Sequence, residues 1–329
     1  MNLLRVELSR FYARVLLWCV SGGLILVSLF VGFVAWNSST PPSAAEVEQA
    51  RSYYDQAVKD WAETGDQQIK DCEDSEAQAK QDDPTADYGC DTMAPKLEYY
   101  LPYTPTLDSD GTRYLGQTSL AVVLAIGLMS VSFVAAEFSS GAIGNWLTFA
   151  PRRTPVFVSK LGAALIGSLP ATILALAVAA GGVILAFSAH GLLDAATGEQ
   201  WATFRDTALR ILVLAPIAAA SGVALAFLLR HTAAVLGVVI GWAVLWEGLL
   251  GSLVQSLRPY TIVFDIAAWV EGGTTYYVND CSVRNDDGTF GCRTIEHTLH
   301  MTQAGLQLGG LVVVLVVVAL LVFRRRDVA

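Results

Sequence analysis

The chain has 329 residues, of which 53% are hydrophobic and only 16% are charged. A soluble domain carries charge on about a quarter of its residues, and the apolar residues here form runs of about 20, long enough to cross about 30 Å of hydrocarbon. We therefore expect an all-α polytopic membrane protein with six transmembrane helices. The formal net charge of −9 arises largely in one segment, so it does not indicate a nucleic-acid-binding protein.

The charges divide between segments on the two sides of the predicted membrane. Residues 37–116 carry 17 acidic and 6 basic side chains, a balance of −11. Ten basic and 3 acidic side chains lie in four other segments: 1–14, 137–160, 230–231 and 324–329. Because Lys and Arg near the ends of spans are retained in the cytoplasm, we expect these four segments, and both termini, to lie inside.

The first predicted region is 1–36. Apolar residues of 1–18 alternate with Arg5, Glu7, Arg10 and Arg14, a pattern typical of an amphipathic helix in the inner headgroup layer. A first span of about Val15–Trp36 follows. A cleaved signal peptide is the alternative, but this apolar run is too long and lacks a clear small-x-small cleavage site.

The second region, 37–116, is predicted to be a small extracellular domain pinned by a disulfide. Ser43 and Glu46 form a capping-box pattern, after which apolar residues recur at helical spacing toward Cys72. The acidic residues of this region do not have the spacing of a calcium-binding loop. We expect a solvated acidic face and no metal site.

Four of the five cysteines fall in segments predicted to lie outside: Cys72, Cys90, Cys281 and Cys292. An even set in an oxidising compartment indicates two disulfides. Three pairings are possible, and the spacing favours Cys72–Cys90 and Cys281–Cys292. Cys19, inside the first apolar run, is expected to be an inert, packed thiol.

The rest of the chain gives five spans. They are expected at about Gln117–Ala136, Val158–His190, Leu209–Leu229, Thr232–Val254 and Gly305–Phe323. Region 117–254 thus holds spans two to five, with a cytoplasmic loop at 137–160 and a short outer connection at 191–206. Region 255–303 is an extracellular segment with a hairpin turning at Asp287-Gly288, and region 304–329 is the last span with its basic tail.

The loop 137–160 holds the most specific motif in the sequence. It resembles the loop between the second and third spans of type-2 ABC transporter permeases, which has the form E-x3-G, then an L-x3-P-x-R-like stretch, then a Lys that enters the next span. The matching residues here are Glu137, Gly141, Leu147, Pro151, Arg153 and Lys160. In that family the segment is a coupling helix that inserts into a cleft of a partner ATPase. Ile143, Trp146, Leu147 and Phe149 would form the apolar plug.

The resemblance implies the membrane-spanning permease subunit of a bacterial-type ABC exporter in the plasma membrane, dimeric with a second copy or a related chain. The chain has no G-x4-G-K-[ST], so ATP and Mg²⁺ would bind a separate ATPase and this chain would not itself be an enzyme. The other partners would be membrane lipids. The alternative is a non-transporting sensor or assembly factor with a ligand-binding ectodomain.

Two acidic residues near or within spans are candidates for function. Glu247 is the one acid well inside a predicted span, where a carboxylate must face a cavity or a partner. It is a candidate for the substrate pathway, and the alternative is a carboxylate hydrogen-bonded to a neighbouring helix. Glu137 lies at the inner boundary, where an ion pair with Arg5, Arg10 or Arg14 would tie the entry helix to the loop.

Overall fold

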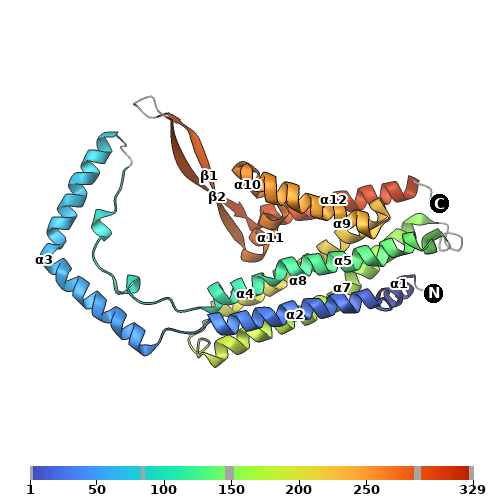
Figure 1. Ribbon diagram of the computed structural model, residues 1–329, viewed down its shortest axis with the longest axis horizontal. Helices are drawn as coiled ribbons and strands as arrows, with labels where there is room; N and C mark the ends of the chain where they lie inside the picture. The colour runs from blue at the N-terminus through green and yellow to red at the C-terminus, as the bar shows by residue number, and fades with distance from the viewer. Residues whose placement is uncertain (1–2, 83–85, 145–151, 285–289, 326–329) are drawn as a thin grey trace. The chain divides into compact units, whose positions relative to one another are not determined.

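The computed structural model describes residues 3–82, 86–144, 152–284 and 290–325 (Figure 1). The chain forms two compact units, one made of Met1–Ser39 with Thr106–Ala329 and one made of Thr40–Pro105. We call the first the membrane unit, because it contains all six helices of the described residues that are long and apolar enough to cross a membrane. This agrees with the predicted multi-pass membrane protein.

The helical elements of the membrane unit are α1 (Leu3–Tyr12), α2 (Val15–Ser38), η3 (Leu107–Gly111), α4 (Thr112–Gly116), α5 (Thr118–Ser139), α7 (Arg153–Ala189), α8 (Gly198–Leu229), α9 (Thr232–Trp242), η4 (Ala243–Leu250), α10 (Gly251–Leu253), η5 (Gln255–Tyr260), α11 (Ile262–Glu271) and α12 (Met301–Arg325). The candidate spans are α2, η3 to α5, α7, α8, α9 to α10, and α12. The described ends of α1 and α12 lie at one end of the bundle, here called the termini end (Figure 1).

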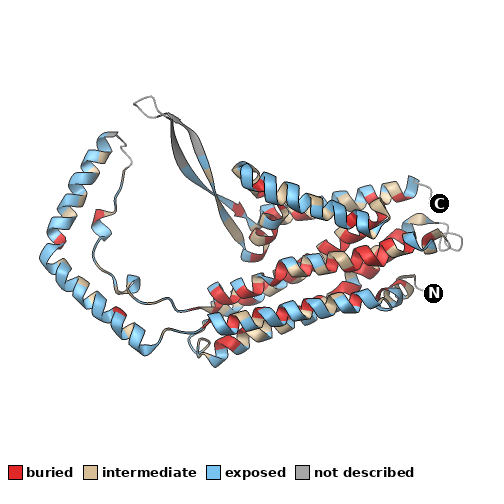
Figure 2. Ribbon diagram, viewed as in Figure 1, coloured by how far each residue is buried: buried red, intermediate tan, exposed pale blue. Residues whose placement is uncertain are grey.

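The core of the membrane unit lies along α5 and α8, which are its most buried spans (Figure 2). Their backbones approach closely: a Cβ added to Gly222 of α8 would lie 2.6 Å from the carbonyl oxygen of Gly127 on α5. A second close crossing joins α2 to α7, where a Cβ on Gly182 would lie 2.8 Å from Cα of Gly32. Small residues at helix crossings are a normal device of membrane bundles, because they allow close backbone packing.

The fourth span begins earlier than its hydrophobicity predicts. α8 starts at Gly198, so the predicted connection 191–206 is wrong for its last nine residues. Thr197 and Gln200 form a capping box, in which the Thr197 hydroxyl accepts from the Gln200 amide at 3.3 Å and the Gln200 side chain accepts from the Thr197 amide at 3.2 Å. This T-x-x-Q signature is visible in the sequence. Because the residues that follow it are polar, the span was predicted to begin later, where the apolar run starts.

The second compact unit contains the long helix α3 (Ala44–Asp82) and two short helices, η1 (Cys90–Thr92) and η2 (Leu97–Tyr99). The predicted capping box is present, with the Ser43 amide donating to Glu46 Oε2 at 2.7 Å and the Glu46 amide donating to Ser43 Oγ at 3.3 Å. The unit is shorter than the predicted region 37–116. Residues 106–116 belong to the membrane unit, where Leu107 and Leu115 are fully buried.

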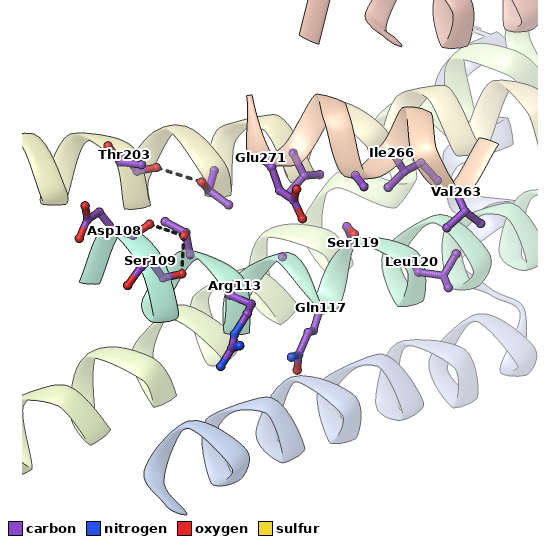
Figure 3. A pocket seen from close by; sticks show the side chains of 15 residues that line it. Asp108, Ser109, Arg113, Gln117, Ser119, Leu120, Thr203, Val263, Ile266 and Glu271 are labelled. Atoms are coloured by element: carbon purple, nitrogen blue, oxygen red, sulfur yellow. Dashed lines mark hydrogen bonds between the residues drawn. The ribbon is translucent and has the colours of Figure 1, made fainter. Parts of the chain in front are cut away.

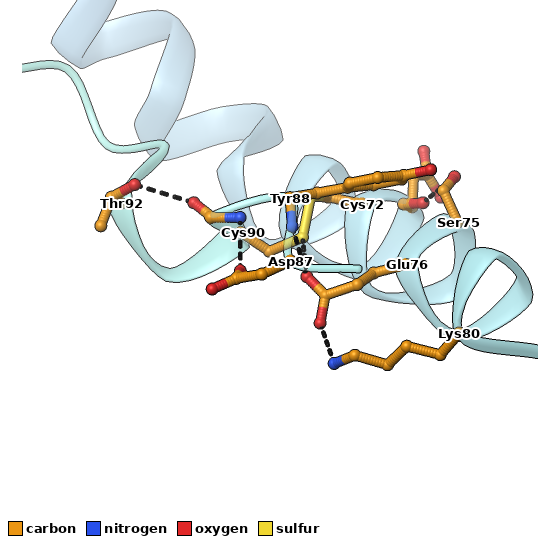
Figure 4. Close-up of a disulfide and its surroundings, with 10 residues drawn as sticks. Cys72, Ser75, Glu76, Lys80, Asp87, Tyr88, Cys90 and Thr92 are labelled. Atoms are coloured by element: carbon orange, nitrogen blue, oxygen red, sulfur yellow. Dashed lines mark hydrogen bonds and ion pairs between the residues drawn. A yellow bond between two sulfur atoms is a disulfide. The ribbon is translucent and has the colours of Figure 1, made fainter. Parts of the chain in front are cut away.

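The predicted Cys72–Cys90 disulfide is present and joins α3 to η1 (Figure 4). Glu76, one helical turn after Cys72, accepts from the Tyr88 amide at 3.0 Å and pairs with Lys80. The disulfide and these contacts hold the chain after α3 against the helix. Cys19 lies exposed on α2, so the prediction that its thiol is packed in the protein interior is wrong.

The predicted hairpin is present and is longer than the sequence suggested. β1 (Gly273–Arg284) and β2 (Phe290–His300) pair antiparallel from Gly273 opposite His300 to Arg284 opposite Phe290. The predicted turn at 287–288 and the side chains of 280–293 lie outside the described parts of the chain. The expected Cys281–Cys292 disulfide therefore stays a prediction.

Candidate functional site

A buried cluster of charges joins three helices at the termini end of the membrane unit. Nζ of Lys160, on α7, lies 2.9 Å from Glu7 Oε2 on α1 and 2.6 Å from Glu137 Oε2 on α5. The exposed fraction is 0% for Lys160, 1% for Glu7 and 5% for Glu137. Arg10, at the surface, lies 3.9 Å from Glu137 and 4.0 Å from Glu7. Two buried acids are thus balanced by one buried base and by Arg10 at the surface.

This arrangement is a structural link as well as a charge balance. Removing water from an ion costs several kcal/mol, and the mutual attraction repays it only while every partner is in place. The helices that carry Glu7, Glu137 and Lys160 are therefore held in one arrangement by a set of contacts that fails if any member leaves. We call Glu7, Arg10, Glu137 and Lys160 the ionic cluster.

The predicted pairing of Glu137 with the entry helix is confirmed for Arg10, but the main partner was missed. Lys160 is the closer cation, and Arg14 instead donates to the Ser132 carbonyl at 3.1 Å. A signal for Lys160 existed in the sequence, because a lysine at the start of a long apolar helix needs a buried partner. The resemblance singled out Lys160 without indicating that partner.

An aromatic ring closes one side of the ionic cluster. The ring centre of Phe133 lies 4.8 Å from Lys160 Nζ and 5.8 Å from the Arg14 guanidinium carbon. Phe11 of α1 packs edge-on against Phe133 with 5.1 Å between ring centres. Cation–π contacts are strongest where the cation has lost its water, so this ring adds to the link between α1, α5 and α7.

The loop that follows Glu137 is described at both of its ends. α5 ends at Ser139, and Gly141, which follows shortly after, has a φ of +71° that glycine adopts readily. Residues 142–144 are helical. Ile143 is 1% exposed and packs in the core. Its predicted place on a plug for a partner is therefore wrong, because its side chain is already enclosed by this chain. The predicted plug and motif residues Trp146, Leu147, Phe149 and Pro151 lie outside the described residues.

Arg153 fixes the beginning of α7 to the end of α12. Its Nη1 donates to the carbonyl oxygens of Phe323 at 3.1 Å and Arg324 at 3.2 Å. Carbonyls of a helix C-terminus carry partial negative charge, so a guanidinium there is favourable. Below it, the rings of Phe157, Phe227 and Phe323 pack together. Arg153, a residue of the predicted loop motif, thus attaches the end of the loop to the last span.

The carboxylate of Glu247 stabilises the start of a neighbouring helix. It lies on η4 and accepts hydrogen bonds from the backbone amides of Ile262 at 2.8 Å and Val263 at 3.2 Å, the first residues of α11. Trp242 Nε1 donates to it at 3.2 Å. Amides at a helix N-terminus favour a negative charge. These contacts match the alternative interpretation, in which the carboxylate is hydrogen-bonded to a neighbouring helix. The hydrogen bonds offset the cost of placing a carboxylate in a span, which was the reason for considering Glu247 a pathway residue.

A second acid near Glu247 was not anticipated from the sequence. Asp265 on α11 is buried, and Gln307 of α12 is assigned with its amide nitrogen toward it because the amide then also donates to the Pro259 carbonyl at 3.0 Å. Burial and the carboxylate of Glu247 raise the pKa of Asp265 to about 7. Within the described residues, no cation pairs with Asp265. The sequence did not reveal this buried acid, because Asp265 looks like one polar residue of an amphipathic segment.

Two cavities open in the membrane unit away from the ionic cluster. The first has a volume of about 460 Å³ and a polar rim that includes Asp108, Arg113 and Glu271 (Figure 3). We call it the polar pocket. The second has a volume of about 310 Å³ and lies among α5, α8, α9, η4, α11 and α12, with lining that is almost all apolar. We call it the apolar cleft, and Glu247 is among its lining residues.

Within the described ranges, no group of three or more His, Cys, Asp or Glu side chains could hold a metal ion. The ionic cluster can transmit position between helices, and the cavities can accept a ligand. No protein-family model, curated protein or solved structure matches the chain, so these residues are the basis for assigning a function.

Proposed function

We propose that this chain is the membrane-spanning permease subunit of an ATP-driven exporter of the type-2 ABC class. Two such chains, or this chain and a related one, would pair with two ATPase subunits that bind ATP and Mg²⁺. In this proposal the acidic unit Thr40–Pro105 and the β1–β2 hairpin lie outside the cell. Both termini, with α1 as an amphipathic entry helix, lie on the cytoplasmic side.

The observation that carries the proposal is the position of the ionic cluster at the base of the loop 141–152. Glu137 is in the last turns of α5, before the loop, and Lys160 is in the second turn of α7, after it. Lys160 pairs with Glu137 and with Glu7 of α1, so it joins all three helices. A subunit driven by an ATPase needs a rigid connection between the segment that is pushed and the spans that move. The ionic cluster supplies such a connection.

The loop is also connected to the last span, which widens the part of the bundle that would respond. Arg153 joins the end of the loop to the carbonyls of Phe323 and Arg324. A displacement of residues 145–151 by a partner would therefore act on α1, α5, α7 and α12 together. In this mechanism the chain contributes no catalytic group, and its role is to convert a movement of the loop into a tilt of the spans.

The proposal is tested by co-expressing the chain with an ABC-class ATPase from the same organism. The ATPase should co-purify, and its ATP turnover in liposomes should rise when this chain is present. Trp146→Asp should abolish that rise, because it places a charge in the predicted plug. Arg152→Ala is the matched control, since it removes one exposed charge of the same loop and should keep most of the stimulation.

Two results would contradict the proposal. One is the absence of any ATPase that binds the chain and responds to it, which would favour a sensor or assembly factor. The other is a normal response from Trp146→Asp, which would exclude the loop as the coupling segment.

A further inference from the structure

The polar pocket and the apolar cleft share part of their lining. Three residues, Leu120 of α5 with Val263 and Ile266 of α11, line both cavities. The polar pocket is formed by η3, α4 and the end of α11 (Figure 3). The apolar cleft lies between α5, α8 and α12. A ligand that occupies both must have a polar head and an apolar tail, with its junction at Leu120.

The apolar cleft offers a tail no polar partner. Its lining includes three polar side chains, and each is already bonded within the chain. Ser221 Oγ donates to the Ile217 carbonyl at 2.9 Å, while the Trp242 indole and the carboxylate of Glu247 bond to each other at 3.2 Å. The volume of about 310 Å³ is at the lower end of the range for ligand sites. Such a cleft suits one hydrocarbon chain.

The polar pocket has the opposite character, and its charge is negative. Asp108 of η3 and Glu271 at the end of α11 are both among its lining residues, and Figure 3 shows them at separate places along the pocket. Arg113 is the one cation among the lining residues, and it pairs with Asp110 at 3.2 Å. Within the described chain, neither Asp108 nor Glu271 has a cationic partner. Their carboxylates are therefore available to a ligand.

The arginine beside this pocket, Arg210, bonds to a backbone carbonyl and does not pair with Glu271 in the described chain. Arg210 on α8, which lies beside the end of α11, donates to the Val270 carbonyl at 3.2 Å. Partial burial raises the pKa of Glu271 above its ordinary value, and a hydrogen bond from Thr274 opposes that rise. A positive group in the pocket would form a charge-assisted hydrogen bond with Glu271, which is stronger than a neutral one.

We propose that the two cavities bind a single-chain cationic amphiphile, with its head between Asp108 and Glu271 and its hydrocarbon chain in the apolar cleft. The site lies within one copy of the chain and requires no ATPase. It can therefore be tested whether or not the chain works as a permease.

The test uses two photoreactive probes that differ only in the head group, dodecylamine and dodecyl sulfate, each with a diazirine in the hydrocarbon chain. The amine is cationic near neutral pH, as the side chain of lysine is. The purified protein in zwitterionic nanodiscs is irradiated with each probe, and cross-linked residues are found by mass spectrometry. We expect saturable labelling of cleft residues such as Leu128 and Leu225 by the amine, in at least about tenfold excess over the sulfate.

Two variants with matched controls locate the head and the tail. Asp108→Asn with Glu271→Gln should lower amine labelling about tenfold, whereas Glu199→Gln, an exposed acid of α8 outside both cavities, should not change it. Ser221→Phe should block the cleft and abolish labelling there. Val213→Phe adds the same ring on an exposed face of α8 and should leave labelling intact.

Labelling spread evenly over the lipid-exposed residues would overturn the proposal, and so would equal or preferential labelling by the sulfate. The change at Asp108 and Glu271 is on exposed side chains and should not affect folding. Unchanged amine labelling in that variant would therefore also overturn it, even if Ser221→Phe fails to fold.

Discussion

The two ends of the membrane unit accommodate buried and half-buried carboxylates in different ways. At the termini end, Glu7 and Glu137 are balanced by Lys160 and Arg10. Away from that end, Glu247 and Asp265 are held by backbone amides and by the amide of Gln307. Ion pairs between side chains hold the helices together, and removing one partner leaves the other as an unpaired ion. Charge balanced by dipoles leaves net negative charge, which makes that end sensitive to protons and to cations.

The largest effect is expected from breaking the ionic cluster. Lys160→Met leaves Glu7 and Glu137 buried with only the surface residue Arg10 nearby, so it should lower the free energy of unfolding by about 3–5 kcal/mol. Thermal unfolding of the purified protein in detergent measures this loss. Lys80→Met is the control, because Lys80 pairs with Glu76 at the surface and its loss should change the unfolding temperature far less.

A triple variant distinguishes a buried-charge penalty from lost packing. Replacing Lys160 by Met and both Glu7 and Glu137 by Gln removes every fully buried charge of the cluster, and buried ion pairs are often replaceable in this way. The triple variant should therefore be more stable than Lys160→Met alone. If it is less stable, the methylene groups of Lys160 and their contacts outweigh its charge, and the ionic cluster is not what links the helices.

A smaller effect is expected at the other end. Glu247→Ala removes the carboxylate from the start of α11, where the loss of a capping group costs about 0.5–2 kcal/mol. Hydrogen exchange should accelerate at the amides of Ile262 and Val263, which donate to Glu247. Asp206→Ala, at an exposed ion pair with Arg205, is the control and should leave exchange in α11 unchanged. Equal exchange in both variants would show that α11 does not depend on Glu247.

Much of the fold could be predicted because its signals are local. Six apolar runs gave six candidate spans, the S-x-x-E pattern gave the start of α3, and proximity in sequence favoured Cys72–Cys90. Errors arose where a polar sequence is helical, as at the beginning of α8, or where packing decides exposure, as at Cys19 and Ile143. Those properties depend on neighbours that are remote along the chain.

The candidate site shows the same division. Glu137 and Lys160 were found from a motif, but Glu7 is separated from Lys160 by more than 150 residues and only the fold brings them together. The structure also indicates which substitution is unsuitable for testing the role of Glu137. A lysine at this buried position would face Lys160, so Glu137→Lys would disrupt folding and could not isolate a coupling defect. Trp146→Asp, in the loop itself, is the sharper test.

The last expected effect, and a small one over any single pH unit, is a pH dependence that comes from Asp265. The pKa of Asp265 is about 7 in the folded protein, above its ordinary value of 3.8. The folded state therefore binds a proton that the unfolded state releases between about pH 4 and pH 7, and stability falls as the pH rises through this window, by at most about 1.4 kcal/mol per pH unit. Above the folded pKa this contribution is fully lost.

Asp265→Asn removes this titration while keeping a side chain of similar size that Gln307 can still contact. The stability of the wild-type protein relative to the variant should decline by about 1 kcal/mol between pH 6 and pH 7 and level off above pH 8. Denaturant unfolding in detergent, followed by near-ultraviolet circular dichroism at each pH, measures the difference. Parallel profiles for wild type and Asp265→Asn would mean that Asp265 is ionised in the folded protein, with the Gln307 amide outweighing burial and the charge of Glu247.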